Sequence, residues 1–513
     1  MSSEQAGGPP PGLEGNLINV VKGGGVTFAA KLFLAASRFA LAVLLARLLG
    51  AEQYGLYSLA LSAAALCAGL ALLGMDAALV RHVAIAASRR DEAGLWGTLQ
   101  VGVGASVAAS ALLGAGLFAL AYPIAERLFG EPALAPLLQL VSAIVPLLTL
   151  SDTLSSASRG FKRMDYSALA QFVAQPVVRL ALTLALALAG VDAAAAVLIF
   201  GAANGAAALL LLYFLNRQFA LRRPLRAGRR DTRQIMGFAL PFWISSLITT
   251  FQGNVQTLLV GSLGSIAGAG VFAMADQLNT LGNLFSSSIN ISARPLIAEL
   301  HDRGDRRQLG EVYQAAAKWA LSVNLPIFLA MVLFAEPILA IFGEEFTAGA
   351  AALAILACAN LVNVGTGMGG IILDMAGYTK LKLINSVVRL ALHLSLSALL
   401  IPRHGILGAA VTVLIVEGAI NLARLLEVYI LLGLLPYNRS FAKPLAAAAA
   451  ALLSVLLAGG PLSGAPALLA TALLGLLLFA VYAGVTLLLG LSPLERTMLA
   501  RVQQRMRGAL ARG

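Results

Sequence analysis

The stretch VVRLALTLALALAG, residues 177–190, places an arginine inside an apolar run. A second stretch, VVRLALHLSLSALL at residues 387–400, repeats its first six letters with an arginine at the same place. Two apolar runs that carry the same internal charge indicate two copies of one structural unit. The repeat therefore bears on both the fold and the position of a functional charge.

The composition is that of an integral membrane protein. Of the 513 residues, 59% are hydrophobic and 12% are charged, whereas soluble domains have roughly 45–50% and 25%. Apolar runs of about 20 residues recur along the chain, and each can cross a hydrocarbon core of roughly 30 Å as a helix. The runs are continuous and not alternating, which argues against a β-barrel. We predict an all-α polytopic protein with about 14 transmembrane helices.

Basic residues collect in alternate loops, as in the seven arginines between residues 217 and 233. By the positive-inside rule these loops face the cytoplasm, and so do both termini. We expect a multi-pass protein of the cytoplasmic (inner) membrane. Its net charge of +12 is explained by contact with anionic inner-leaflet lipids, without nucleic acid.

Three further matches extend the repeat. They are VLIFGAAN (197–204) with VLIVEGAIN (413–421), GFKR (160–163) with GYTK (377–380), and LGAEQYG with LGSIAGAG, which aligns Gly55 with Gly270. Each copy covers six spans, an even number, so both copies keep the same orientation. We expect two lobes related by a pseudo-two-fold axis along the membrane normal, with substrate held between them.

The predicted organisation follows from these matches and from the charged breaks. It comprises an N-terminal tail (1–22), an N-lobe (23–216), a basic inter-lobe loop (217–234), a C-lobe (235–433), two appended helices (434–490) and a cationic amphipathic tail (491–513). The last tail spaces its apolar residues at helical intervals between arginines. We expect it to lie on the inner leaflet, with binding to a partner protein as the alternative.

Four cations fall within predicted spans: Lys31, Arg38, Arg179 and Arg389. A central Lys or Arg costs about 2.5–3.5 kcal/mol on insertion scales, so such residues normally face a cavity or a partner. Lys31 can alternatively reach the interface by snorkelling, and the arginines can alternatively pair with buried acids. A cavity lined by arginines selects an anion and suits phosphate oxygens. The sequence favours a phosphate-bearing or acidic substrate.

Other polar residues have two interpretations each. His393, Asn254 and Gln256 are predicted to line the same cavity, or else to pack and bond across helices. Asp276, Glu417 and Asp374 are candidates for coupling transport to a proton or sodium gradient, or else for neutralising an arginine. The sequence lacks phosphate-loop, zinc-protease and nucleophile-turn motifs, so we expect no enzymatic activity, metal or cofactor.

The segments SRFALAVLLARLLGAEQYGLYSLA (37–60) and GMDAALVRHVA (74–84) resemble Wzx-type flippases, the polysaccharide-transport branch of the multidrug, oligosaccharidyl-lipid and polysaccharide exporter superfamily. The resemblance implies alternating access by two lobes around a cationic cavity. It also implies a polyprenyl-diphosphate-linked oligosaccharide as cargo, moved from the inner to the outer leaflet for cell-surface polysaccharide synthesis. Lys31, Arg38, Arg179 and Arg389 would meet the diphosphate or acidic sugars.

An ion gradient or the membrane potential is the expected driving force, and glycan polymerase machinery is a further expected partner. Two alternatives stay open. One is an ion-coupled multidrug exporter of the same superfamily, which would depend on Glu417 or Asp276 and not on the arginines. The other is a non-transporting scaffold of a glycan-assembly complex, which would depend on the tail at 492–513.

Overall fold

The structure is a computed structural model that describes residues 13–219, 228, 231–459 and 467–489. The described residues form helices and contain no strand, which confirms the predicted all-α class. They divide into two compact units: unit 1 is Met1–Met274 with Ser397–Ile406, and unit 2 is Ala275–Leu396 with Leu407–Gly513. The predicted cationic tail at 491–513 and most of the basic loop at 217–234 lie outside the described residues.

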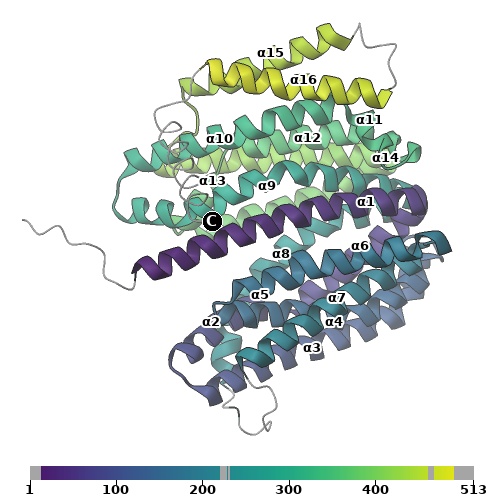
Figure 1. The fold of residues 1–513 in the computed structure, drawn as a ribbon, viewed down its shortest axis with the longest axis vertical. Helices are drawn as coiled ribbons and strands as arrows, with labels where there is room; N and C mark the ends of the chain where they lie inside the picture. Colours follow the sequence, from purple (N-terminus) through teal and green to yellow (C-terminus); the bar gives the residue numbers. More distant parts are fainter. Residues whose placement is uncertain (1–12, 220–227, 229–230, 460–466, 490–513) are drawn as a thin grey trace, which may run out of the picture. The chain divides into compact units, whose positions relative to one another are not determined.

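Unit 1 holds the helices of the first half of the chain (Figure 1). They are α1 (Leu13–Ala71), α2 (Met75–Ser88), α3 (Glu92–Pro123), α4 (Leu134–Gly160), α5 (Met164–Ala168), α6 (Gln175–Leu186), α7 (Ala193–Gln218) and α8 (Thr232–Leu263). Short π-helical turns at Ile124–Leu128 and Leu169–Ala174 and a 3₁₀ turn at Ala187–Ala189 complete it. Helix α4 packs against α1, α2, α3 and α7, and fully buried Met75, Leu79 and Leu211 fill the space between α2, α3, α4 and α7.

Unit 2 holds most of α9 (Ile266–Asp302), which begins in unit 1. The other helices are α10 (Arg306–Leu333), α11 (Ala335–Ala340), α12 (Ala350–Gly365), α13 (Gly369–Met375), α14 (Thr379–Leu432), α15 (Ala442–Gly459) and α16 (Ala467–Leu488), with 3₁₀ turns at Glu344–Gly349 and Arg439–Phe441. The middle of α14, Ser397–Ile406, belongs to unit 1. The appended helices α15 and α16 pack on each other and on α10. Tyr482 Oη donates to Ser322 O at 2.7 Å and joins α16 to α10.

Among the described residues, ten helical stretches are long and apolar enough to cross a membrane. Two of them, Phe33–Ala71 and Lys380–Leu432, contain a glycine outside helical geometry: Gly50 at φ 69° and Gly405 at φ 55°. Each glycine divides its stretch into two helices, because it adopts a conformation that other residues avoid. The count of about fourteen spans stays a prediction.

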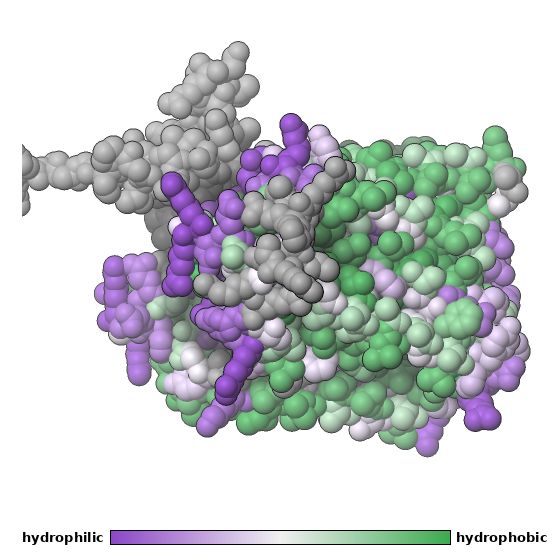
Figure 2. Space-filling view, turned by 90° about the horizontal axis from the view of Figure 1, so that it is seen from below, coloured by the Kyte–Doolittle hydropathy of each residue, from purple (hydrophilic) through white to green (hydrophobic). Residues whose placement is uncertain are grey.

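The first helix begins at Leu13 and not near residue 23, so part of the predicted N-terminal tail is helical. No proline interrupts the chain from Leu13 to Gly50, and the helix continues unbroken through the glycines at 23–25. Figure 2 shows one face of the molecule, on which hydrophobic residues form a band with hydrophilic residues at both ends. A band of this kind is the surface that a bilayer requires.

Aspartates begin several helices after loops. The side chain of Asp91 accepts from the backbone N–H of Gly94 at 2.8 Å, and that of Asp192 accepts from Ala195 N–H at 2.8 Å. Such caps satisfy backbone donors that have no partner inside the helix, and each contributes about 1 kcal/mol. They fix the starts of α3 and α7.

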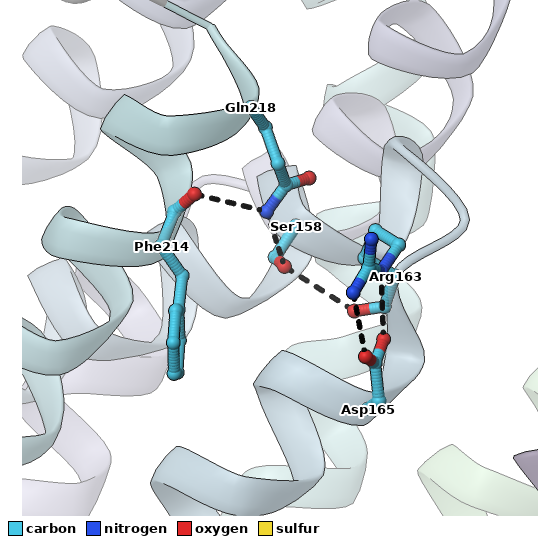
Figure 3. Close-up of polar contacts among 5 residues, drawn as sticks. All are labelled: Ser158, Arg163, Asp165, Phe214 and Gln218. Carbon is cyan, nitrogen blue, oxygen red and sulfur yellow. Dashed lines mark hydrogen bonds and ion pairs between the residues drawn. The ribbon is translucent and has the colours of Figure 1, made fainter.

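A hydrogen-bond network closes the turn between α4 and α5 (Figure 3). Gln218 Nε2 of α7 donates to Phe214 O at 3.2 Å and to Ser158 Oγ at 3.5 Å, and Ser158 Oγ donates to Arg163 O at 3.3 Å. The Arg163 guanidinium meets both oxygens of Asp165, at 2.9 and 3.1 Å. The chain entering α5 is thereby tied to the ends of α4 and α7.

This turn corrects one of the sequence alignments. Lys162 takes the left-handed conformation at φ 62°, and the corresponding residue before α14 is Gly377 at φ 87°. Both turns carry the same backbone hydrogen bonds, Lys162 N to Arg159 O and Gly377 N to Asp374 O. The match of GFKR with GYTK, which set Gly160 against Gly377, is therefore out of register by two residues.

Helix α8 packs within unit 1, although the repeat assigns it to the second lobe. Trp243 Nε1 donates to Leu70 O at 3.0 Å. A Cβ on Gly74 would lie 2.1 Å from the backbone oxygen of Ala239. Only glycine at position 74 therefore allows the start of α2 to approach α8 this closely. The predicted lobe bounds stay a prediction.

Candidate functional site

Arg179 lies on α6 in unit 1 between two aromatic rings. Its guanidinium carbon is 5.0 Å from the ring centroid of Phe200 on α7 and 5.8 Å from that of Tyr57 on α1. Its Nε is buried and has no hydrogen-bond partner among the described residues. Cation–π contacts recover about 0.5–2 kcal/mol of the cost of burying the charge, but they do not neutralise it.

A second cation lies nearby on α1. Arg38 is exposed, and its charge interacts with that of Arg179. Neither arginine forms an ion pair with a carboxylate among the residues that the structure describes. A buried guanidinium group without a carboxylate partner can bind an anion, and its donor geometry suits phosphate oxygens.

Arg389, the counterpart in unit 2, has a different environment. Its Nη2 forms an ion pair with Glu417, and the two side chains are 20% and 12% exposed. Asn421 Nδ2 also donates to Glu417 Oε2, at 3.2 Å. The positive charge of Arg389 is therefore neutralised inside the protein, which is one of the two interpretations that the sequence left open.

Phe200 and Glu417 occupy matching positions in the two copies. Asn204 Nδ2 donates to Phe200 O at 2.8 Å, and Asn421 Nδ2 donates to Glu417 O at 2.9 Å. Each asparagine thus bonds the carbonyl one turn earlier, and that residue contacts the arginine of the preceding span. The same structural position carries an aromatic ring in one copy and a carboxylate in the other.

The remaining cavity candidates lie in different settings. Lys31 is on α1, but its side chain lies outside the described residues. Asn254 Nδ2 donates to Thr250 O of its own helix at 3.0 Å. Gln256 is 7% exposed and exchanges hydrogen bonds with Ser397 at 3.2 and 3.3 Å, so it bonds across helices. His393 is 5% exposed and is packed inside unit 2.

The three acids proposed from the sequence also differ from one another. Asp374 pairs with Lys382 at 2.8 Å, and Glu417 pairs with Arg389. Asp276 on α9 is half-buried and forms no ion pair with the described residues. Asp276 is therefore the acid of the three whose charge has no cation beside it in the described part of the chain.

Two residues that contact Arg179 were not predicted from the sequence. Tyr57 and Phe200 read as ordinary apolar packing in text dominated by Leu and Ala. The available signal was the comparison of VLIFGAAN with VLIVEGAIN, since aligning the final asparagines sets Phe200 opposite Glu417. That substitution of an aromatic residue for an acid marks the contact position of both arginines.

The described helices, with ten stretches able to cross a membrane, form the fold of a multi-pass membrane protein. A family model described as "Polysaccharide biosynthesis protein" matches residues 20–301, more than half of the chain. A second model, MatE, matches residues 241–399. The chain belongs to the polysaccharide biosynthesis protein family, in the polysaccharide-transport branch of the multidrug, oligosaccharidyl-lipid and polysaccharide exporter superfamily.

Individual relatives agree with this assignment. The "Probable low-salt glycan biosynthesis flippase Agl15" of Haloferax volcanii is 23% identical over 223 residues, which are 43% of this chain and 46% of that protein. "Stage V sporulation protein B" of Bacillus subtilis is 26% identical over 303 residues, 54% of this chain and 58% of that protein. The alignments span about half the length of these relatives.

The fold has solved counterparts. The structure of "Lipid II flippase MurJ, inward closed conformation" superposes with a TM-score of 0.69, at 14% identity, and the match covers 90% of this chain and 98% of that chain. At this level of identity the likeness shows the shared helical fold alone. The predicted resemblance to this superfamily is confirmed by the family models and by these relatives.

Proposed function

We propose that this protein is a flippase that turns a polyprenyl-diphosphate-linked oligosaccharide from the inner to the outer leaflet of the cytoplasmic membrane by alternating access. The observation that carries the proposal is the guanidinium of Arg179, which has no carboxylate partner among the described residues and whose charge interacts with that of Arg38. A diphosphate supplies the negative charge that the protein does not supply there. The printed names of the glycan flippase Agl15 and the lipid II flippase MurJ support the choice of a lipid-linked glycan as cargo.

The asymmetry between the two arginines assigns them different roles in this proposal. Arg179 binds the diphosphate, since it has no internal counter-ion among the described residues. Arg389 stabilises unit 2 through Glu417. The predicted orientation places the basic loops and both termini on the cytoplasmic side, where anionic lipids and glycan polymerase machinery are the proposed partners.

We further propose that a proton or sodium gradient, or the membrane potential, drives the cycle through Asp276. Its carboxylate forms no ion pair with the described residues, unlike those of Glu417 and Asp374. An intramembrane acid without a cation is a normal element of ion-coupled transport. Asp276→Asn would then abolish the response of flipping to an imposed gradient while cargo binding persists.

The test uses the full chain in proteoliposomes with a fluorescent polyprenyl-diphosphate oligosaccharide. Arg179→Gln removes charge-assisted hydrogen bonds worth about 1.5–3 kcal/mol, so flipping should fall at least tenfold. Arg389→Gln should act mainly on stability, and Arg439→Gln, which changes an exposed arginine, should flip normally. Normal flipping by a folded Arg179→Gln protein would refute the anion site. If neither the wild type nor any variant flips this lipid, the proposed identity of the cargo is refuted.

A further inference from the structure

Unit 2 contains a polar cavity that is separate from the residues around Arg179. Its volume is about 210 Å³, and it lies between α12, α13 and the two halves of α14. Its polar lining consists of Asn363, Asp374, Lys382, Asn385, Asn421 and Arg424. A cavity lined by six polar side chains inside a membrane unit is unusual, because each buried polar group needs a hydrogen-bond partner.

Several lining groups already have partners. Lys382 Nζ meets Asp374 Oδ2 at 2.8 Å. Asn385 Nδ2 donates to both oxygens of Glu427, at 2.8 and 3.1 Å. These bonds fix the side chains, and Asn385 and Asn421 are 6% and 3% exposed. Asn385 and Asn421 are therefore buried side chains of the cavity wall that are held by hydrogen bonds.

Other atoms of the same residues carry no hydrogen bond to the described part of the chain. The acceptors are the Oδ1 atoms of Asn385, Asn421 and Asp374, whose bonds all run through their other polar atom. The donors are the guanidinium of Arg424, which makes no hydrogen bond or ion pair with described residues, and the amide of Asn363. Residues with vacant donors and residues with vacant acceptors thus line the same small cavity.

The combination of vacant donors and vacant acceptors favours one chemical class of ligand over others. A bare anion would meet three vacant acceptors and the charges of Asp374 and Glu427, both of which act on Arg424. A bare cation would meet Lys382 and Arg424. A hydroxyl group both donates and accepts, so it can satisfy both kinds of partner at once. The volume is below the roughly 300 Å³ of pockets for drug-sized ligands, which leaves room for a single sugar ring.

We infer that this cavity of unit 2 binds one uncharged sugar residue through its hydroxyl groups, with Arg424 as the main donor and Asn385 and Asn421 as acceptors. The inference rests on the proposed function for its biological meaning, since a carrier of lipid-linked glycans must accommodate sugar as well as phosphate. The two sites then divide the cargo chemically. Arg179 serves the diphosphate, and the unit 2 cavity serves a sugar.

Gly370 offers a way to close the cavity without altering its charges. A Cβ there would lie 3.5 Å from Arg424 Nε, which is ordinary van der Waals contact, so a side chain is tolerated at the backbone. A leucine at this position would extend into the space before Arg424. Gly370→Leu therefore blocks the cavity, whereas Arg424→Gln removes the guanidinium and leaves the space.

The experiment measures binding of free sugars to the full chain in nanodiscs by saturation-transfer NMR. The probes are glucose, galactose, rhamnose, N-acetylglucosamine and N-acetylgalactosamine, with sodium chloride and inorganic phosphate as separate arms. At least one sugar should bind the wild type and the exposed-site control Arg439→Gln. Binding should weaken at least tenfold in Arg424→Gln and vanish in Gly370→Leu, while thermal unfolding confirms that both variants fold.

Three outcomes would overturn the inference: no sugar of the panel binds, a sugar binds Gly370→Leu as it binds the wild type, or phosphate or sodium alone responds to Arg424→Gln. Arg179→Gln separates this site from the proposed function, because it should keep sugar binding while it loses flipping. If sugar binds but the polyprenyl-diphosphate oligosaccharide is not flipped, the sugar site in unit 2 is supported and the proposed flippase function is refuted.

Discussion

Gly55 of α1 and Gly270 of α9 lie in backbone contact, and the sequence repeat aligns these two glycines with each other. A Cβ on Gly55 would lie 2.0 Å from Ile266 O, and a Cβ on Gly270 would lie 2.3 Å from Ala51 O. Each glycine faces the residue four positions before the other glycine. A reciprocal contact of this kind is what a two-fold axis produces where equivalent residues meet.

Alanine at Gly55 should destabilise the protein. The added methyl group would overlap the Ile266 carbonyl, and the helices must separate at a cost of about 1–3 kcal/mol. Thermal unfolding of Gly55→Ala should show a lower midpoint than the wild type. Gly104→Ala is the matched control, since no atom lies within 4 Å of a Cβ at that helical glycine. Equal midpoints for the two variants would contradict the close crossing.

Breaking the ion pair of unit 2 should also reduce stability. Glu417→Gln leaves Arg389 without its counter-ion, at a cost of roughly 3 kcal/mol, the lower end of the range for buried pairs because both groups keep some exposure. The double variant Arg389→Leu with Glu417→Leu removes both charges and should recover most of the loss. The measurement is the denaturation midpoint in detergent. A single variant as stable as the wild type would show that the pair contributes nothing.

Glycine at Lys162 should stabilise the turn between α4 and α5. Lys162 adopts φ 62°, which costs a residue with a side chain about 1–2 kcal/mol. The matching turn in the second copy already uses Gly377. We expect Lys162→Gly to raise the free energy of unfolding by about 0.5–1 kcal/mol, after the entropy cost of glycine. Lys162→Ala keeps the strain, so an equal gain in that variant would attribute the effect to lost charge.

The fold was predictable from the sequence because apolar runs and their repeat are long-range patterns. The spacing of the arginines identified two related copies, and Gly55 and Gly270 then meet as an axis requires. The register of the turns was not predictable. Gly160 looked like the partner of Gly377, but backbone hydrogen bonds place Lys162 there, and a lysine carries no mark of a left-handed conformation in the sequence.

The candidate site was predictable in part. Arg179 and Arg389 were both assigned to a cationic cavity, and the helix positions that contact them do correspond. What separates them is one residue on the following span, aromatic or acidic, whose contact depends on how the helices pack. The vacant donors and acceptors of the unit 2 cavity depend on side-chain conformation in the same way.

In the proposed function, Arg179 binds cargo because Phe200, and not a carboxylate, lies beside it. Phe200→Glu copies the arrangement of Arg389 and Glu417 into unit 1, and Phe200→Gln changes size and polarity without charge. The decisive measurement is the rate of flipping of a polyprenyl-diphosphate oligosaccharide in proteoliposomes. We predict that Phe200→Glu loses at least tenfold in rate while Phe200→Gln stays near the wild type. Equal rates for the two folded variants would contradict the account.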